Sequence, residues 1–179
     1  MEPYDYQNSM GFIVNSTAKM FVKALDSELR KSIGVTFSQW KILVMMSVKD
    51  GTTQKEIANG LGLEGATLIP ILDKMEKDGL VVRKVDLADR RNNRIYRTEK
   101  AENLWPAMVE SALKMREISV RDIPSTHVTI TRDSLQKIYR NLETHVNVNV
   151  TNESSTPAAA ASILTPNKIT STNATNQEN

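Results

Sequence analysis

The clearest chemical feature of this sequence is a cluster of positive charge near its middle. Residues 83–97 carry a net charge of +4, whereas the whole chain of 179 residues carries only +2. The rest of the chain is therefore net negative, and the cations are concentrated on one short segment. Basic side chains gathered in this way are typical of a surface that binds nucleic-acid phosphates. The basic residues of this segment are Arg83, Lys84, Arg90, Arg91, Arg94 and Arg97.

The residue types used in catalysis and metal binding are scarce. The chain has no cysteine, which excludes disulfides, cysteine-ligated zinc, iron–sulfur clusters and a thiol-based sensor. The two histidines, His127 and His145, lie far from the acidic clusters, and there is no glycine-rich phosphate loop. We therefore expect a protein that is not an enzyme, with no catalytic residue, no metal and no cofactor.

A spacing pattern just before the basic segment predicts a helix-turn-helix. Counting from Gln54, the small residue Ala58 falls where two helices cross closely, and Gly62 falls where the turn needs a positive φ. Leu68 and Ile71 fall where the second helix must pack on the core. These five positions fit one supersecondary unit. Because the basic segment follows at once, the two features together point to DNA binding.

Hydrophobic periodicity predicts the helices that must position this unit. A first helix over about 9–33 ends at Gly34. Capping boxes then open the next two helices, one at Thr36-Phe37-Ser38-Gln39 and one at Thr53-Gln54-Lys55-Glu56. A fourth helix covers about 65–77.

After the helix-turn-helix the pattern changes. Residues 80–85 and 94–97 alternate as strands on either side of a polar loop, which predicts a two-stranded hairpin. Another helix follows Thr98, with a kink or a late start at Pro106, and a last one covers about 131–146. The residues expected to face inward are Val14, Ala18, Phe21, Leu25 and Leu29 in the first helix, Phe37, Trp40, Leu43 and Val44 in the second, Ala101, Leu104, Met108, Ala112 and Met115 after the hairpin, and Leu135, Ile138, Tyr139, Leu142 and Val146 in the last.

The composition changes again at residue 147. Residues 147–179 are rich in Asn, Thr, Ser and Ala and have no aromatic residue, so we expect a disordered tail. The longest run of large apolar residues, at 42–46, is too short to span a bilayer, and residues 1–5 do not resemble a signal peptide. We expect a cytoplasmic protein with no membrane contact.

Several motifs carry a family resemblance. They are residues 36–40 (TFSQW), 53–58 (TQKEIA), 61–63 (LGL), 72–83 (LDKMEKDGLVVR), the hairpin loop 86–94 (DLADRRNNR) and 98–100 (TEK). On these motifs, residues 36–105 resemble the MarR family of winged helix-turn-helix transcription regulators. The hairpin loop with its Asp-Arg-Arg sequence is the most specific of them.

The resemblance implies an architecture and a function. The fold would be mainly α, with one domain over 1–146 made of a DNA-binding lobe at about 36–98, dimerisation helices at about 9–33 and 99–146, and a two-stranded β wing. Such proteins typically act as homodimers that bind pseudo-palindromic double-stranded DNA, usually as repressors. Many of them respond to a small aromatic effector.

The resemblance also implies roles for single residues. The recognition helix would face the major groove, Arg90 would enter the minor groove, Arg94 would meet phosphate, and the pair Asp89 and Arg91 would brace the wing. Thr53, at a helix N-terminus, would present backbone N–H groups to a phosphate. The expected DNA-binding residues are Thr53, Ala66, Thr67, Ile69, Pro70, Lys74, Arg90, Arg91 and Arg94. An effector crevice would be lined by Phe12, Phe37, Trp40, Trp105 and Met108, unless these are ordinary core residues.

Two other functions stay open at this stage. The recognition helix offers few side-chain donors to base edges, which keeps a non-specific architectural DNA binder possible. A winged helix can also serve as a protein–protein interaction module, although protein partners rarely need a charge of +4 in fifteen residues. Equal affinity for scrambled duplexes would favour the first alternative, and no duplex binding at low salt would favour the second.

Overall fold

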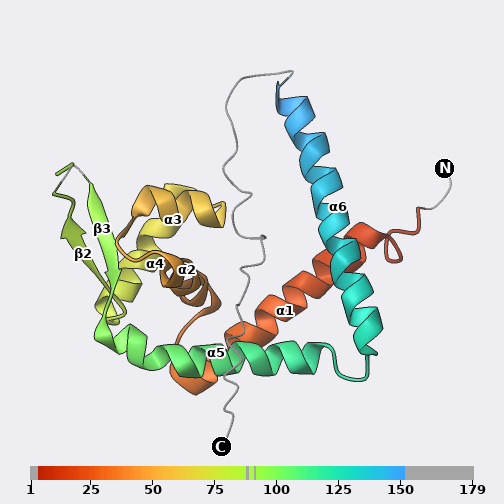
Figure 1. Cartoon of the computed structure of the whole chain (residues 1–179), viewed down its shortest axis with the longest axis horizontal. Coiled ribbons are helices and arrows are strands. Elements are labelled where there is room, and N and C mark those ends of the chain that lie inside the picture. Colours follow the sequence, from red (N-terminus) through yellow and green to blue (C-terminus); the bar gives the residue numbers. More distant parts are fainter. Residues whose placement is uncertain (1–3, 88, 91, 152–179) are drawn as a thin grey trace, which may run out of the picture.

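The computed structural model describes residues 4–87, 89–90 and 92–151. It is mainly helical, with a small sheet beside the central helices (Figure 1). The elements in chain order are α1 (Met10–Ile33), α2 (Phe37–Val48), β1 (Thr52–Thr53), α3 (Gln54–Leu61), α4 (Gly65–Lys77), β2 (Val81–Val85), β3 (Asn93–Arg97), α5 (Glu99–Ser119) and α6 (Ser125–Thr151).

The predicted helix caps around the helix-turn-helix are confirmed. The Thr36 hydroxyl accepts a hydrogen bond from the Gln39 N–H, and the Gln39 side chain accepts one from the Thr36 N–H. Thr53 and Glu56 form the same reciprocal pair at the start of α3. Gly62 ends α3 with φ +61°, a left-handed conformation that favours glycine. The threonines therefore begin these helices through side-chain hydrogen bonds, and the glycine ends one through its left-handed conformation.

The sheet has three strands rather than the two expected. Its order is β1-β3-β2, and both pairings are antiparallel, with Thr52 opposite Ile95 and Val81 opposite Arg97. Strand β1 is only two residues long, so it leaves no alternation in the sequence for a pattern to detect. Its effect is to attach the hairpin β2–β3 directly to the start of α3.

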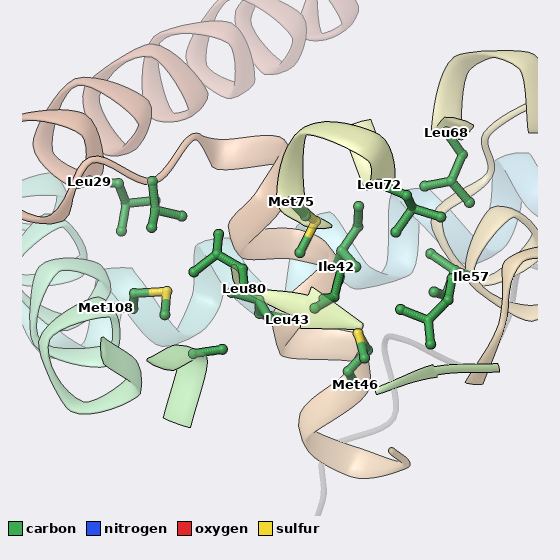
Figure 2. Close-up of a cluster of buried hydrophobic side chains, with 14 of the residues drawn as sticks. Leu29, Ile42, Leu43, Met46, Ile57, Leu68, Leu72, Met75, Leu80 and Met108 are labelled. Carbon is green, nitrogen blue, oxygen red and sulfur yellow. The ribbon is translucent and has the colours of Figure 1, made fainter. Parts of the chain in front are cut away.

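The core lies between α2, α3, α4, the sheet and the facing sides of α1 and α5. Figure 2 shows buried side chains of this core, among them Leu29, Leu43, Ile57 and Met108. Leu43, Leu68 and Met108 are buried as expected, but Val44 is 38% exposed, and Ile42 and Met46 are buried instead. The prediction for Val44 was wrong because residues 42–46 are all apolar, so periodicity alone cannot choose which side faces the core.

Helices α1 and α6 bury much less than the sequence pattern indicates. In α1 only Leu25 and Leu29 are buried, while Val14 and Phe21 are exposed. No described side chain of α6 is buried, and Figure 1 shows this helix standing away from the sheet and α4. The apolar residues exposed on α6 are Ile130, Leu135, Tyr139, Leu142 and Val146. The inward-facing prediction is therefore wrong for a single chain, because no other described element of that chain covers these faces.

The boundaries of the C-terminal elements also differ from expectation. Helix α5 begins at Glu99 and continues through Pro106, so a late start is wrong. Helix α6 begins at Ser125 rather than near 131 and runs to Thr151, five residues into the expected tail. Residues 152–179 lie outside the described part of the chain. No helix among the described residues is long and apolar enough to cross a bilayer.

Candidate nucleic-acid interface

Helix α4 presents one side to the core and the other to solvent. Leu68, Leu72 and Met75 are buried at helical spacing. The residues predicted to face DNA lie on the opposite side and are all exposed; they are Ala66, Thr67, Ile69, Pro70 and Lys74. These five residues form a mostly apolar strip with one hydroxyl and one ammonium group, while Asp73, Glu76 and Lys77 are also exposed on α4.

The start of α3 is already occupied by a carboxylate. The Thr53 N–H donates to Glu56 Oε2 at 2.7 Å, and the Thr53 hydroxyl also bonds to it at 2.9 Å. The hydrogen bond from the Thr53 N–H, followed by that from Lys49, lowers the pKa of Glu56 to about 2. An incoming phosphate would therefore meet a negative charge at Thr53. The exposed Lys55, to which the sequence pattern assigned no role, lies in the first turn of α3 and is better suited to phosphate.

The described part of the wing loop forms a tight turn. The Asp86 N–H donates to the Asn92 carbonyl at 2.9 Å, and the Asn92 N–H donates to the Asp89 carbonyl at 2.9 Å. The Asn92 side-chain amide also donates to the Asp89 carboxylate at 3.0 Å. Arg90 is exposed at this turn, as expected for a groove contact. Arg91, and with it the predicted brace between Asp89 and Arg91, lies outside the described residues.

Arg94, whose side chain is 34% exposed, makes two contacts within the lobe. Its Nε lies 2.7 Å from Asp86 Oδ2, and its Nη1 donates to the Gly51 carbonyl at 2.9 Å. Asp86 itself is only 8% exposed. Arg94 therefore ties the wing loop to the turn before β1, a contact that the phosphate role assigned from the resemblance did not anticipate.

The turn before β1 is held by further residues of β3. Gly51 has φ +68°, and a Cβ placed there would lie 2.8 Å from the ring of Tyr96. The Arg97 N–H donates to Asp50 Oδ1 at 3.0 Å. With Arg94, these contacts fix the wing against the helix-turn-helix at one point.

A second attachment joins the wing to the recognition helix. The guanidinium of Arg83, on β2, bonds to Asp73 at 2.6 Å and to Glu76 at 2.5 Å, both on α4. The sequence identifies Arg83 as a cation but not its partners, because its acids lie seven and ten residues away. Arg83 and Arg94 thus mainly position the wing, which leaves Arg90 as the exposed cation in the described part of the wing loop.

The residues of the expected effector crevice do not all come together. Trp40 and Trp105 stack with ring centroids 5.2 Å apart, and Met108 is fully buried in the core. Phe12 instead contacts Tyr6, with centroids 4.9 Å apart. Phe12 lies seventeen residues before the core residue Leu29 on α1, which is about 26 Å along a helix, so it is far from Met108 in the core.

An open groove lies along the outer side of α5. It has a volume of about 680 Å³ and is lined by Trp105, Pro106, Val109, Glu110, Leu113, Lys114 and Glu117. Of the expected crevice residues only Trp105 borders it. Within the described residues no group of three or more acidic or histidine side chains is arranged to hold a metal ion.

A helix-turn-helix followed by a β hairpin and packed between terminal helices defines a winged-helix protein. Residues 35–92 match the sequence model described as MarR family. The transcriptional regulator TtmR of Methylorubrum extorquens is 31% identical over 103 residues, which cover 58% of this chain and 52% of TtmR. This chain therefore matches about half the length of that regulator.

Solved structures agree over most of the chain. A MarR-family transcriptional regulator from a Rhodococcus species is 27% identical with a TM-score of 0.66, covering 76% of this chain and 96% of that one. CouR from Rhodococcus jostii, solved with p-coumaroyl-CoA, is 26% identical with a TM-score of 0.62, covering 74% and 92%. Residues 35–92 are thus similar in sequence to the MarR family, and the chain shares the winged-helix fold of these solved regulators.

Proposed function

We propose that this protein is a DNA-binding transcription regulator of the MarR type that acts as a homodimer on a pseudo-palindromic site in the cytoplasm, most simply as a repressor. The observation that carries this proposal is the position of the wing. Arg83 and Arg94 attach it to α4 and to the turn before α3, so that Arg90 and the exposed side of α4 belong to one rigid lobe.

The chemistry of that surface indicates how DNA would be read. Arg90 suits a narrow minor groove, where arginine responds to groove shape rather than to base identity. The strip on α4 has methyl and methylene groups at Ala66, Ile69 and Pro70, which suit thymine methyls in the major groove. We therefore propose a preference for A·T-rich half-sites.

The exposed apolar faces of α1 and α6 support the homodimer. Val14 and Phe21 on α1 and Leu142 and Val146 on α6 are exposed in the single chain. Covering such faces with a second copy would stabilise the dimer by about 25 cal/mol per Å² of apolar surface removed from water. A two-fold dimer would also present two recognition helices to two half-sites.

We also propose that an aromatic effector binds this protein. The relative CouR was solved with p-coumaroyl-CoA, an aromatic thioester. In this chain the stacked Trp40 and Trp105 join α2 to α5 beside the α5 groove, and we propose this pair as the place where an aromatic ligand would act. Quenching of tryptophan fluorescence on titration with aromatic acids and their thioesters would test it.

The interface is tested by removing the charge of Arg90. We expect Arg90→Ala to weaken duplex binding and to reduce the slope of log K against log salt by about one, because one phosphate-region contact is lost. Fluorescence anisotropy on a labelled A·T-rich duplex at several salt concentrations measures both quantities.

A matched control is Arg116→Ala, which removes an exposed arginine from α5, outside the proposed interface. Its affinity and salt slope should equal those of the unmodified protein. If Arg90→Ala binds as tightly as this control, the wing is not a DNA contact and the proposed interface is wrong.

A further inference from the structure

A buried amide joins two helices that the helix caps alone would not connect. Gln39, on α2, is only 2% exposed. Its Oε1 accepts a hydrogen bond from the Thr36 N–H at 2.8 Å, which completes the capping box. Its Nε2 donates to Oδ2 of Asp78, at the end of the recognition helix α4, at 3.1 Å.

Asp78 is the point where several contacts with α4 meet. Its Oδ1 accepts from the ammonium of Lys74 at 2.5 Å, and its carbonyl accepts from Lys100 of α5 at 2.7 Å. The hydrogen-bonded ion pair with Lys74, followed by the hydrogen bond from Gln39, lowers the pKa of Asp78. The carboxylate is therefore charged at neutral pH, and Gln39 presents its donor to a negative group.

The other end of this network reaches α1. Asp26 Oδ1 accepts from the Phe37 N–H at 2.7 Å, and its Oδ2 accepts from Arg30 Nε at 2.6 Å. Asp26 and Gln39 thus hold the adjacent N–H groups of Phe37 and Thr36. Hydrogen bonds on either side of the Thr36–Phe37 peptide therefore connect α1, through the start of α2, to the end of α4.

The chain supplies its own comparison for the role of the amide. The capping box of α3 uses a glutamate, Glu56, in the position that Gln39 occupies in α2. Either residue serves the cap, since only the side-chain oxygen is needed. A glutamate at position 39 would place its carboxylate against that of Asp78. The side chain at this position therefore needs an N–H donor for Asp78 as well as an oxygen for the cap, and glutamine supplies both.

We propose that Gln39 is a positioning residue for DNA binding: through Asp78 it fixes the end of α4 against the α1–α2 junction and so sets the angle of the recognition helix relative to α1. This role depends on the proposed function, because the angle matters only if α4 enters a groove. In a two-fold dimer that angle would determine the separation of the two recognition helices.

The link can be broken and rebuilt without losing the cap. Gln39→Glu keeps the acceptor for Thr36 but places two carboxylates together. Adding Asp78→Asn to it restores a hydrogen bond of reversed polarity, in which the amide introduced at position 78 would donate to the new carboxylate at position 39. Asp78→Asn alone keeps the acceptor for Gln39 and loses only the ion pair with Lys74, which makes it the control for that loss.

The readout is the distance between α1 and α4 in the full chain. Because the protein has no cysteine, spin labels can be placed at Lys19→Cys and Lys77→Cys, and electron–electron distances measured after dilution with unlabelled protein. We expect Gln39→Glu to shift or broaden the distance distribution, and both the double variant and Asp78→Asn alone to give the original one. Duplex affinity should fall about tenfold in Gln39→Glu and recover in the double variant.

An unchanged distance distribution in folded Gln39→Glu, or no recovery in the double variant, would overturn the proposal. So would a changed distance with unchanged affinity. If Gln39→Glu does not fold, Asp78→Ala breaks the same link from α4 and must give the same shift. Absence of duplex binding by the unmodified protein would refute the proposed function instead, and the distance measurement would still report on the link.

Discussion

Replacing Gly51 tests how the wing is attached to the helix-turn-helix. Gly51 has φ +68°, which costs an alanine about 1–2 kcal/mol, partly offset by the lower entropy of the unfolded chain. The new Cβ would also lie 2.8 Å from Cε1 of Tyr96, and such overpacking adds about 1–3 kcal/mol. We expect Gly51→Ala to lower the free energy of unfolding by about 3 kcal/mol, or the Tm by about 6–12 °C.

Gly62 provides a matched control. Its φ is +61°, but a Cβ there would meet nothing within 4 Å. Gly62→Ala should therefore lose only about 1 kcal/mol, the backbone part of the cost. Thermal unfolding followed by circular dichroism measures both variants, and Tyr96→Ala combined with Gly51→Ala should recover part of the difference. Equal losses for the two glycine variants would show that Tyr96 does not pack tightly against this turn.

Two further predictions concern the helix cap and the core. The pKa of Glu56 is about 2 in the folded chain and near 4.5 when unfolded, so the stabilisation from its charge is complete above pH 4.5 and is lost as the pH falls towards 2. Since the Glu56 side chain is 44% exposed, we expect this contribution to be only about 1 kcal/mol. Glu56→Gln should therefore flatten the pH dependence of the free energy of unfolding between pH 4.5 and 2. An unchanged pH profile would contradict this role of Glu56. Leu43→Ala leaves a cavity at a fully buried position and should lower the free energy of unfolding, measured in urea, by about 2–5 kcal/mol. Val44→Ala, at a position 38% exposed, should lower it by less than half as much. Similar losses for the two variants would contradict the burial of Leu43 and the exposure of Val44.

Local signals in the sequence were sufficient for the lobe. The caps at Thr36, Thr53 and Gly62 and the spacing from Gln54 to Ile71 each depend on neighbouring residues, so the helix-turn-helix could be predicted directly. The contacts of Arg83 and Arg94 could not, because their partners are set by how β2 and β3 pack on α4 and on the Gly51 turn. Charge counting places both arginines on the basic segment, but it cannot show that they also hold the wing.

For the terminal helices α1 and α6, the sequence pattern predicts which residues form an apolar face but not what that face contacts. Helical periodicity correctly indicated apolar faces on α1 and α6, but it cannot say whether the same chain covers them. Leu25 and Leu29 are buried in the core, where α1 packs mainly on α5, while Leu142 and Val146 stay exposed. Periodicity also misplaced the start of α6, because Pro124 is compatible with the position just before a helix and Ser125 can begin one.

The most direct test of the account is whether the full chain binds duplex DNA with sequence preference. Fluorescence anisotropy would compare the region upstream of its own gene with a scrambled duplex of equal composition, at low and at moderate salt. We predict at least tenfold tighter binding to the native duplex, about 1.4 kcal/mol, and a steep loss of affinity with salt. Equal affinities would favour an architectural binder, and no binding to either duplex at low salt would contradict the central claim.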